Sequence, residues 1–136
     1  MNYFLVKSEP YKYSWSELLK DKWTYWDGVR SYAARIHLKA MKLNDQVLFY
    51  HSNEGLEVVG CARVIKEHYQ DPTTDDDRWV AVDIEPIYSF KIPVSLKQIK
   101  ADKKLKDLAL VKQSRLSVVS LTKREFDHIL KLSEKS

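Results

Sequence analysis

Two long runs with high strand propensity constrain the fold of this chain more than any other feature. Residues 58–69 are rich in β-branched and apolar side chains, and residues 79–88 alternate between two sets of side chains, of which one is apolar. Residues 70–78 between them contain three consecutive aspartates and are typical of a solvated surface loop. We therefore expect two long strands side by side, joined by this acidic loop, with a bulge or a close backbone approach at Gly60.

Shorter elements flank this pair. Ser14 with Glu17 and Thr122 with Glu125 have the spacing of a capping box, in which two side chains satisfy backbone donors at the start of a helix. Five or so strands, mostly antiparallel and mixed with short helices, predict a small α+β barrel. We predict helices over residues 15–20, over 31–41 and after 122, helical turns near 95–99 and 105–110, and further strands over 3–6, 46–50 and 116–121.

Length and charge limit the class of protein. At 136 residues the chain fits a single compact domain, residues 1–136. The net charge is +4 and the sequence pI is near 9.0, with lysine and arginine recurring from end to end, which favours a modest basic face. Nucleic acid is the natural partner of such a face, and we expect the domain to act as a monomer.

The single cysteine and the hydropathy pattern bear on location. Cys61 lies in an apolar run, so neither an internal disulfide nor a multi-thiolate zinc site can form, and a reducing compartment is indicated. No apolar run approaches the length of a membrane span, and the apolar start at residues 3–6 meets Lys7 too soon for a signal peptide. We expect a cytoplasmic protein, or a nuclear one in a eukaryote, that uses no membrane, metal or cofactor.

The run Trp26-Asp27-Gly28-Val29-Arg30-Ser31-Tyr32 combines the side chains of a binding pocket. An indole stacks a planar ring, a carboxylate accepts hydrogen bonds from the ring's edge, and a guanidinium holds a phosphate. A flipped-out nucleobase satisfies all three groups. Taken by itself, the run favours a structural turn, in which Trp26 anchors the core and Asp27 or Ser31 caps the next helix.

Eight short stretches in one sequential order cover essentially the whole chain and make it resemble the EVE domain family of the PUA-like superfamily. Two departures are that Ser31 stands where the family usually has asparagine, and that the loop between Tyr69 and Arg78 is shorter than in many members. The matching stretches are Lys7-Ser8-Glu9-Pro10, Trp26-Asp27-Gly28-Val29-Arg30, Ala40-Met41-Lys42, residues 45–52, residues 60–64, Arg78-Trp79, Pro93-Val94-Ser95-Leu96 and Arg115-Leu116-Ser117-Val118.

The resemblance implies a PUA-like barrel of five to six strands, mostly antiparallel, with short helices around it. Its concave face would be similar to that of the methyladenosine-reading YTH domains, and it would bind a modified base of DNA or RNA without altering it. By position, the resemblance places Lys7 and Ser8 at the pocket rim, Trp26 and Asp27 at its wall and floor, Trp79 at the opposite wall, and Arg115 with Ser117 at an edge facing the nucleic-acid backbone.

These positions define a hypothesis for binding. Trp26 and Trp79 form a slot for one flipped base, because stacking on an aromatic face offsets the cost of unstacking that base. Ser52 joins Ser8 and Asp27 in hydrogen bonding to the base edge, and Arg30 joins Lys7 and Arg115 in neutralising phosphates.

An enzyme is the alternative of another class. His51 and Ser52 supply a base and a hydroxyl, and Ser8 and Asp27 would complete a hydrolytic group. Adjacent residues of an extended strand point to opposite faces, so His51 and Ser52 cannot both reach one pocket if the strand continues through them. The sequence also lacks a nucleophile elbow and a phosphate-binding glycine loop. A module that binds a small molecule or a protein in the same slot is a third hypothesis.

Overall fold

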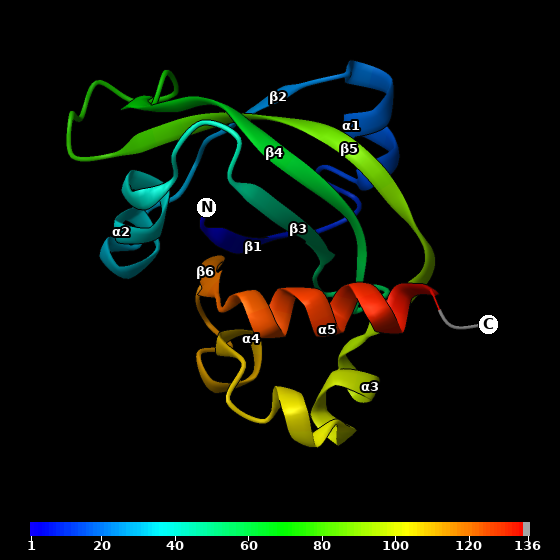
Figure 1. The fold of residues 1–136 in the computed structure, drawn as a ribbon. Coiled ribbons are helices and arrows are strands. Elements are labelled where there is room, and N and C mark those ends of the chain that lie inside the picture. Colours follow the sequence, from blue (N-terminus) through cyan, green and yellow to red (C-terminus); the bar gives the residue numbers. More distant parts are fainter. Residues whose placement is uncertain (135–136) are drawn as a thin grey trace.

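The chain folds around one mixed sheet of six strands (Figure 1). In the computed structural model, which describes residues 1–134, the strands lie in the order β2-β5-β4-β3-β1-β6. Only β1 and β3 pair in parallel, and the other four neighbouring pairs are antiparallel, so the predicted α+β class is confirmed. The strands are β1 (Tyr3–Ser8), β2 (Thr24–Trp26), β3 (Gln46–His51), β4 (Glu57–Gln70), β5 (Val80–Ser95) and β6 (Val118–Leu121).

Capping side chains define where the helices begin. The Ser14 hydroxyl accepts a hydrogen bond from the Glu17 N–H at 3.2 Å, and the Glu17 carboxylate accepts one from the Ser14 N–H at 3.1 Å. Thr122 and Glu125 form the same reciprocal pair, so both predicted capping boxes are confirmed. The helices are α1 (Trp15–Asp21), α2 (Tyr32–Ala40), α3 (Leu96–Ala101), α4 (Ala109–Lys112) and α5 (Lys123–Glu134), with a 3₁₀ turn η1 (Lys103–Leu105).

One helix prediction is wrong in detail. The helical turn expected over residues 105–110 is divided between η1 and α4. Within residues 1–134, no helix combines the length and the apolarity needed to cross a membrane.

The predicted pair of long strands is confirmed and is longer than expected. β5 continues past Tyr88 to Ser95 because Val94 pairs with Val58 near the start of β4. The register of the pair shifts next to Gly60, where the bulge or close approach was expected. A Cβ atom at this glycine would lie 2.3 Å from the Trp15 ring, so a close approach of backbone to indole explains the residue.

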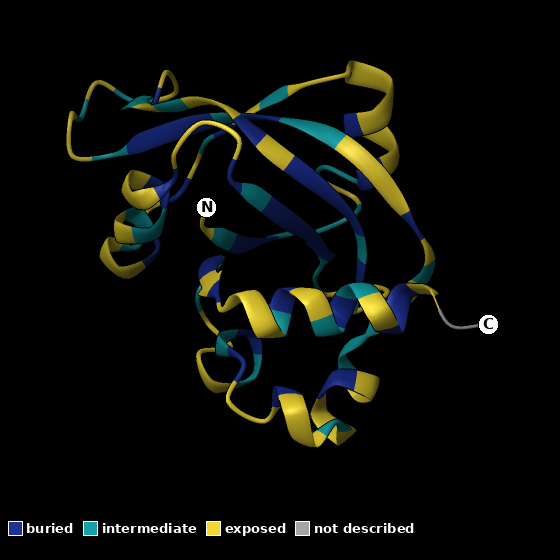
Figure 2. Ribbon diagram, viewed as in Figure 1, coloured by how far each residue is buried: buried dark blue, intermediate teal, exposed yellow. Residues whose placement is uncertain are grey.

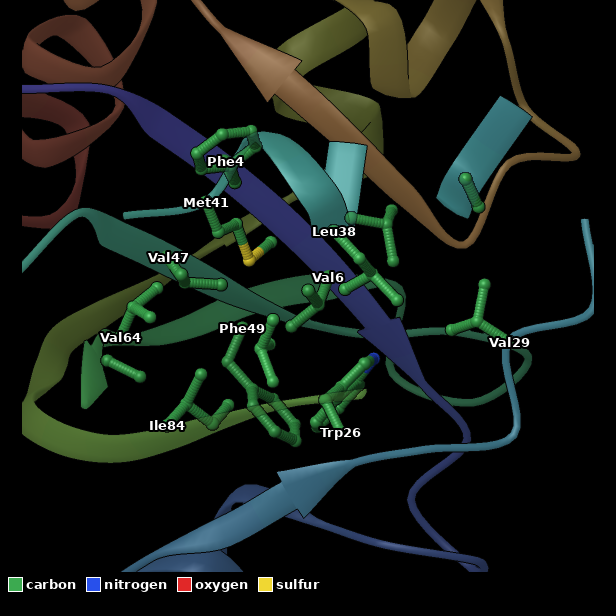
Figure 3. Packing of buried hydrophobic residues seen from close by; sticks show 14 of the residues in the cluster. Phe4, Val6, Trp26, Val29, Leu38, Met41, Val47, Phe49, Val64 and Ile84 are labelled. Atoms are coloured by element: carbon green, nitrogen blue, oxygen red, sulfur yellow. The ribbon is translucent and has the colours of Figure 1, made fainter. Parts of the chain in front are cut away.

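Both faces of the sheet are buried, which explains the apolar runs of its central strands. In β1, Val6 joins one buried cluster and Leu5 joins the other, and in β3, Phe49 and Leu48 divide in the same way because successive side chains point to opposite faces. The first cluster includes residues of α1 and α2, and the second includes residues of α3, α4 and α5. Figure 2 shows buried central strands and helices that expose one side only, and Figure 3 shows part of the first cluster.

The sheet remains open, so the expected closed barrel is not formed. Among residues 1–134, β2 pairs only with β5, and β6 pairs only with β1. β2 offers only three residues, and Gly28, with a φ of 75°, then turns the chain away from the sheet. The two edge strands, β2 and β6, are therefore not paired with each other.

Candidate functional site

A groove of about 1000 Å³ is lined by residues from both edges of the open sheet. One wall comes from β2 and the turn that follows it, and another comes from residues 114–117, which precede β6. Eight of the nine predicted site residues line this groove, and the ninth, Trp79, does not. The eight are Lys7, Ser8, Trp26, Asp27, Arg30, Ser52, Arg115 and Ser117.

The parallel pairing of β1 and β3 brings Ser8 and Ser52 together. Ser8 is in register with His51, and the Ser52 N–H donates a hydrogen bond to the Ser8 carbonyl at 2.9 Å. The Ser8 hydroxyl donates to the Tyr13 carbonyl at 2.6 Å, which ties the loop before α1 to the end of β1. The two serines, far apart in sequence, therefore lie side by side in the groove wall.

Lys7 connects β1 to the opposite wall of the groove. Its N–H donates to the Ser117 carbonyl at 2.9 Å, and its ammonium donates to the Ser114 carbonyl at 2.8 Å. Partial burial lowers the pKa of the Lys7 ammonium. Lys7 thus holds residues 114–117 in place, whereas Arg115 within that segment is exposed.

Trp26 is a buried wall of the groove. Only 9% of its surface is exposed, and its ring meets Phe49 edge to face with centroids 5.5 Å apart and planes at 84° (Figure 3). The indole is therefore fixed by the core and presents only a small part of its surface to the groove.

The expected slot between Trp26 and Trp79 is not formed. Trp79 lies just before β5, with its ring centroid 5.2 Å from that of Tyr32. The guanidinium groups of Arg30 and Arg78 each lie 5.8 Å from the Trp79 ring. The structure holds Trp79 in this cation–aromatic stack next to α2, because the loop before β5 packs there and not over the groove.

Asp71 fixes the turn that carries the groove residues. This carboxylate is fully buried, and it accepts hydrogen bonds from the Gly28 N–H at 2.8 Å and from Arg30 Nη1 at 2.9 Å. It also accepts from the Thr73 N–H at 2.7 Å and the Thr73 hydroxyl at 2.6 Å. Burial by itself would raise the pKa of Asp71, but these hydrogen bonds outweigh it and lower the pKa to about 2.

Arg30 is consequently held on one side. Besides its bond to Asp71, its Nη2 donates to the Thr73 hydroxyl at 3.2 Å, while 40% of the side chain stays exposed. Part of the guanidinium thus remains available along the groove.

Asp27 has the opposite environment. Its carboxylate lines the groove, half-buried, and among residues 1–134 no group donates a side-chain or long-range hydrogen bond to it. Burial raises the pKa of this carboxyl, and a hydrogen bond from its own backbone N–H offsets only part of that rise. A partly buried carboxylate that no side chain of the described residues occupies is the arrangement expected of a ligand-binding group.

His51 does not join this site. Its Nε2 accepts a hydrogen bond from the Trp15 N–H at 3.0 Å, and its ring packs edge-on against Phe49. Ser52 lines the groove and His51 does not, although β3 ends at His51 and Ser52 begins the turn after it. The structure therefore does not assemble the hydrolytic group of His51, Ser52 and Asp27.

The groove residues missed from the sequence include Trp23 and Leu116. Trp23 lines the groove with 49% of its surface exposed, and Leu116 adds an apolar contact to the opposite wall. Trp23 stands three residues before Trp26, but spacing alone did not indicate which of the two rings is buried. Asp71 was assigned to a solvated surface loop with no role of its own, although its Asp-Pro-Thr context is a signal for a turn closed by the aspartate side chain.

Comparison with known proteins identifies the family. The profile of the EVE domain matches residues 2–132. The chain belongs to the EVE domain family. The predicted membership is thus confirmed. The matched region includes the groove and both edge strands of this EVE domain.

Three relatives illustrate how similar this EVE domain is to others. Mouse thymocyte nuclear protein 1 is 37% identical to it, with 98% of this chain and 74% of the mouse protein covered. Protein Atu2648 from Agrobacterium tumefaciens is 42% identical in sequence, and its crystal structure matches with a TM-score of 0.96 over 98% of this chain and 94% of the other. Human THYN1 protein, crystallised in complex with DNA that contains 5-methylcytosine, is 33% identical with a TM-score of 0.92, covering 100% and 99%.

Proposed function

We propose that this EVE domain binds DNA that carries a modified base such as 5-methylcytosine, and that the base enters the groove flipped out of the duplex. The observation that carries the proposal is the half-buried Asp27 carboxylate, which accepts no side-chain or long-range hydrogen bond within residues 1–134. The human relative in complex with 5-methylcytosine DNA supports the choice of nucleic acid and of base. One monomer takes one base.

The edge of the base is held by hydrogen bonds. A carboxylate accepts from the exocyclic amino group of cytosine, and such a contact discriminates between bases by roughly 1–3 kcal/mol. Ser52 and Ser8 lie next to each other in the same groove and offer further polar contacts. A base without an amino group leaves Asp27 desolvated and unpaired, which is unfavourable.

Stacking is supplied by Trp23 together with the fixed wall at Trp26. Trp23 is the groove-lining tryptophan with an open ring, 49% exposed, and stacking on such a ring contributes roughly 1–3 kcal/mol per base. This energy offsets the few kcal/mol that flipping costs. Trp79 has no direct role in this arrangement.

The methyl group is read by apolar contact. Val29 and Leu116 are the aliphatic side chains that line the groove, and burying one methyl group contributes about 1 kcal/mol. We therefore expect only about five-fold preference for the methylated base from this contact. Arg115, Arg30, Lys7 and Ser117 contact the backbone on either side of the base.

The domain reads the base without chemistry, because the one histidine near the groove is committed to the Trp15 amide. We expect it to act in the cytoplasm, or in the nucleus of a eukaryote. Incubation with modified oligonucleotides followed by mass analysis tests this point, and conversion of the oligonucleotide would overturn it.

The direct experiment compares two aspartates. Asp27→Ala is expected to lower affinity for a 5-methylcytosine duplex by about 10- to 100-fold, as loss of a base-edge contact does. Asp75→Ala, at an exposed loop position away from the groove, is the matched control and should bind like the parent protein. Equal affinities of the two variants would contradict the proposal, and an oligonucleotide of RNA tested in parallel measures the preference for DNA.

A further inference from the structure

The net positive charge of this chain resides in one segment. Residues 96–115, named here the basic lobe, carry seven lysine and arginine side chains and two aspartates, a net charge of +5. The whole chain has 23 basic and 19 acidic residues, so the rest carries 16 basic and 17 acidic residues and a net charge of −1. The basic residues recur from end to end as expected, but outside this lobe they are balanced in total by acidic residues.

The basic lobe has one apolar side and one charged side. Leu105 and Leu108 are fully buried, and with Ile99 and Leu110 they pack into the cluster that includes Phe126 of α5. The lysines of the lobe are all exposed, and the α3 and α4 ribbons lie below the sheet in Figure 1 with exposed outer sides in Figure 2. The packing of the leucines therefore leaves the lysines facing solvent.

The lysines are also free of acidic partners. Within the described chain, residues 1–134, none of the six lysines of the lobe forms an ion pair, and the lobe's Asp102 is paired with His128 at 2.6 Å. The Asp102 carboxylate also accepts a hydrogen bond from the Lys104 N–H at 2.9 Å. Since one of the two acidic groups is already occupied, the positive charge of the lobe is left uncompensated.

The lobe leads directly into the groove wall. Lys112 ends α4, and Ser114 and Arg115 follow in the segment that lines the groove. The hydrogen bond from the Lys7 ammonium to the Ser114 carbonyl fixes this junction at 2.8 Å. A strand that leaves the groove past Arg115 therefore comes first to Lys112 at the end of α4, and the other five lysines of the lobe precede it along the chain.

We propose that the basic lobe binds the phosphate backbone that flanks the base held in the groove. This inference rests on the proposed function of the groove and assigns the sequence-independent part of the affinity to the lobe. Duplex DNA carries one negative charge per about 1.7 Å of axis, and each phosphate neutralised by a lysine contributes about 0.9 to the slope of log affinity against log salt. Neutralising contacts position the duplex and carry no base preference.

A triple substitution tests the lobe. Lys103→Gln, Lys104→Gln and Lys106→Gln together remove three exposed charges and leave the buried leucines in place. Fluorescence anisotropy with methylated and unmethylated duplexes of one sequence, at several salt concentrations, measures affinity, salt slope and methyl preference. We expect the slope to fall by about 2–3, and affinity for both duplexes to fall by at least about ten-fold at low salt.

The matched control removes three lysines elsewhere. Lys20→Gln, Lys39→Gln and Lys131→Gln together lower the net charge equally at exposed positions outside the lobe and the groove. If control and lobe variants lose equal affinity and slope, only general charge matters and the inference is wrong. An unchanged slope in the lobe variant overturns it too, and points to an acidic protein surface as the partner.

The design also separates this inference from the proposed function. A lobe variant that loses salt slope while keeping its methyl preference supports both. Absence of methyl preference in the parent protein refutes the groove as a reader of the modification, whereas the slope still decides whether the lobe binds phosphates.

Discussion

Asp27 in the groove and Asp71 in the loop between β4 and β5 lie close to Gly28 but have opposite environments. Asp71 accepts four hydrogen bonds from Gly28, Arg30 and Thr73, and its pKa is lowered to about 2. Asp27 has no such donors, and burial raises its pKa. The Asp71 carboxylate therefore has a structural role, and the Asp27 carboxylate remains available to a ligand.

The same contrast separates the tryptophans of the two regions. Trp26 belongs to the core against Phe49, and Trp79 is held outside the groove by Tyr32 and two arginines. Neither is an open stacking surface in the groove, whereas Trp23 is. In both cases satisfied contacts mark a structural role, and an exposed or unpartnered group in the groove marks a binding role.

The largest expected effect is on the tryptophans. Trp26→Ala should destabilise the fold by roughly 3–4 kcal/mol, because it removes a buried ring and leaves a cavity next to Phe49. Trp79→Ala should cost only about 1 kcal/mol, because its contacts are partly exposed. Urea denaturation measures both, and equal losses would remove the distinction between core and loop tryptophans.

The next effect concerns Asp71. Asp71→Ala should cost roughly 2–4 kcal/mol, since Arg30 and the Gly28 N–H lose their acceptor. Asp27→Ala should change the free energy of unfolding by less than about 0.5 kcal/mol, because no donor depends on it. If the two variants prove equally stable, Asp71 does not fix the turn.

Lowering the pH should cause a smaller loss of stability through the Asp71 carboxylate. The folded pKa of Asp71, about 2, lies below the ordinary value, so its stabilisation is complete above about pH 5 and is lost as the pH falls towards 2. The lost contribution amounts to roughly 2–3 kcal/mol. Asp76 also has a lowered pKa, because Arg78 pairs with it, and it therefore contributes to the acid dependence as well. The difference in unfolding free energy between the parent protein and Asp71→Asn, measured from neutral to acid pH, isolates the contribution of Asp71. A difference that stays constant with pH would mean that Asp71 is not specially stabilised as an anion.

The smallest effect is expected for Trp23. Trp23→Ala should leave the free energy of unfolding within about 0.5 kcal/mol of the parent, because the ring is half exposed. Its affinity for a methylated duplex should nevertheless fall by about 5- to 100-fold through loss of stacking. Calorimetric binding measurements check this, with Trp79→Ala as the control that should retain affinity. Loss of affinity in the control alone would restore Trp79 as the stacking ring.

Much of the fold follows from local signals in the sequence. The capping boxes at Ser14 and Thr122, the long strand pair and the close approach at Gly60 all depend on neighbouring residues or on one pairing, and they are confirmed. The failure to close the barrel depends on how far β2 extends before Gly28, and the alternation of side chains does not carry that information.

The site, too, has features that could be predicted from the sequence and features that could not. The positions carried over from the family converge on one groove except Trp79, because β1, β2 with its following turn, and the segment before β6 all border that groove. The burial of Trp26, the hydrogen bonds of Asp71 and the openness of Trp23 arise from contacts between segments distant in sequence. Such contacts decide which polar and aromatic groups remain free, and one sequence does not specify them.

The most direct test of the account is the affinity of the Asp27→Ala protein for paired duplexes that differ by one cytosine methyl group. We expect the variant to unfold at the same urea concentration as the parent protein and to bind the methylated duplex about 10- to 100-fold more weakly. Its slope of log affinity against log salt should be unchanged. Undiminished affinity of a folded Asp27→Ala protein for the methylated duplex would contradict the central claim that this carboxylate in the groove holds the base.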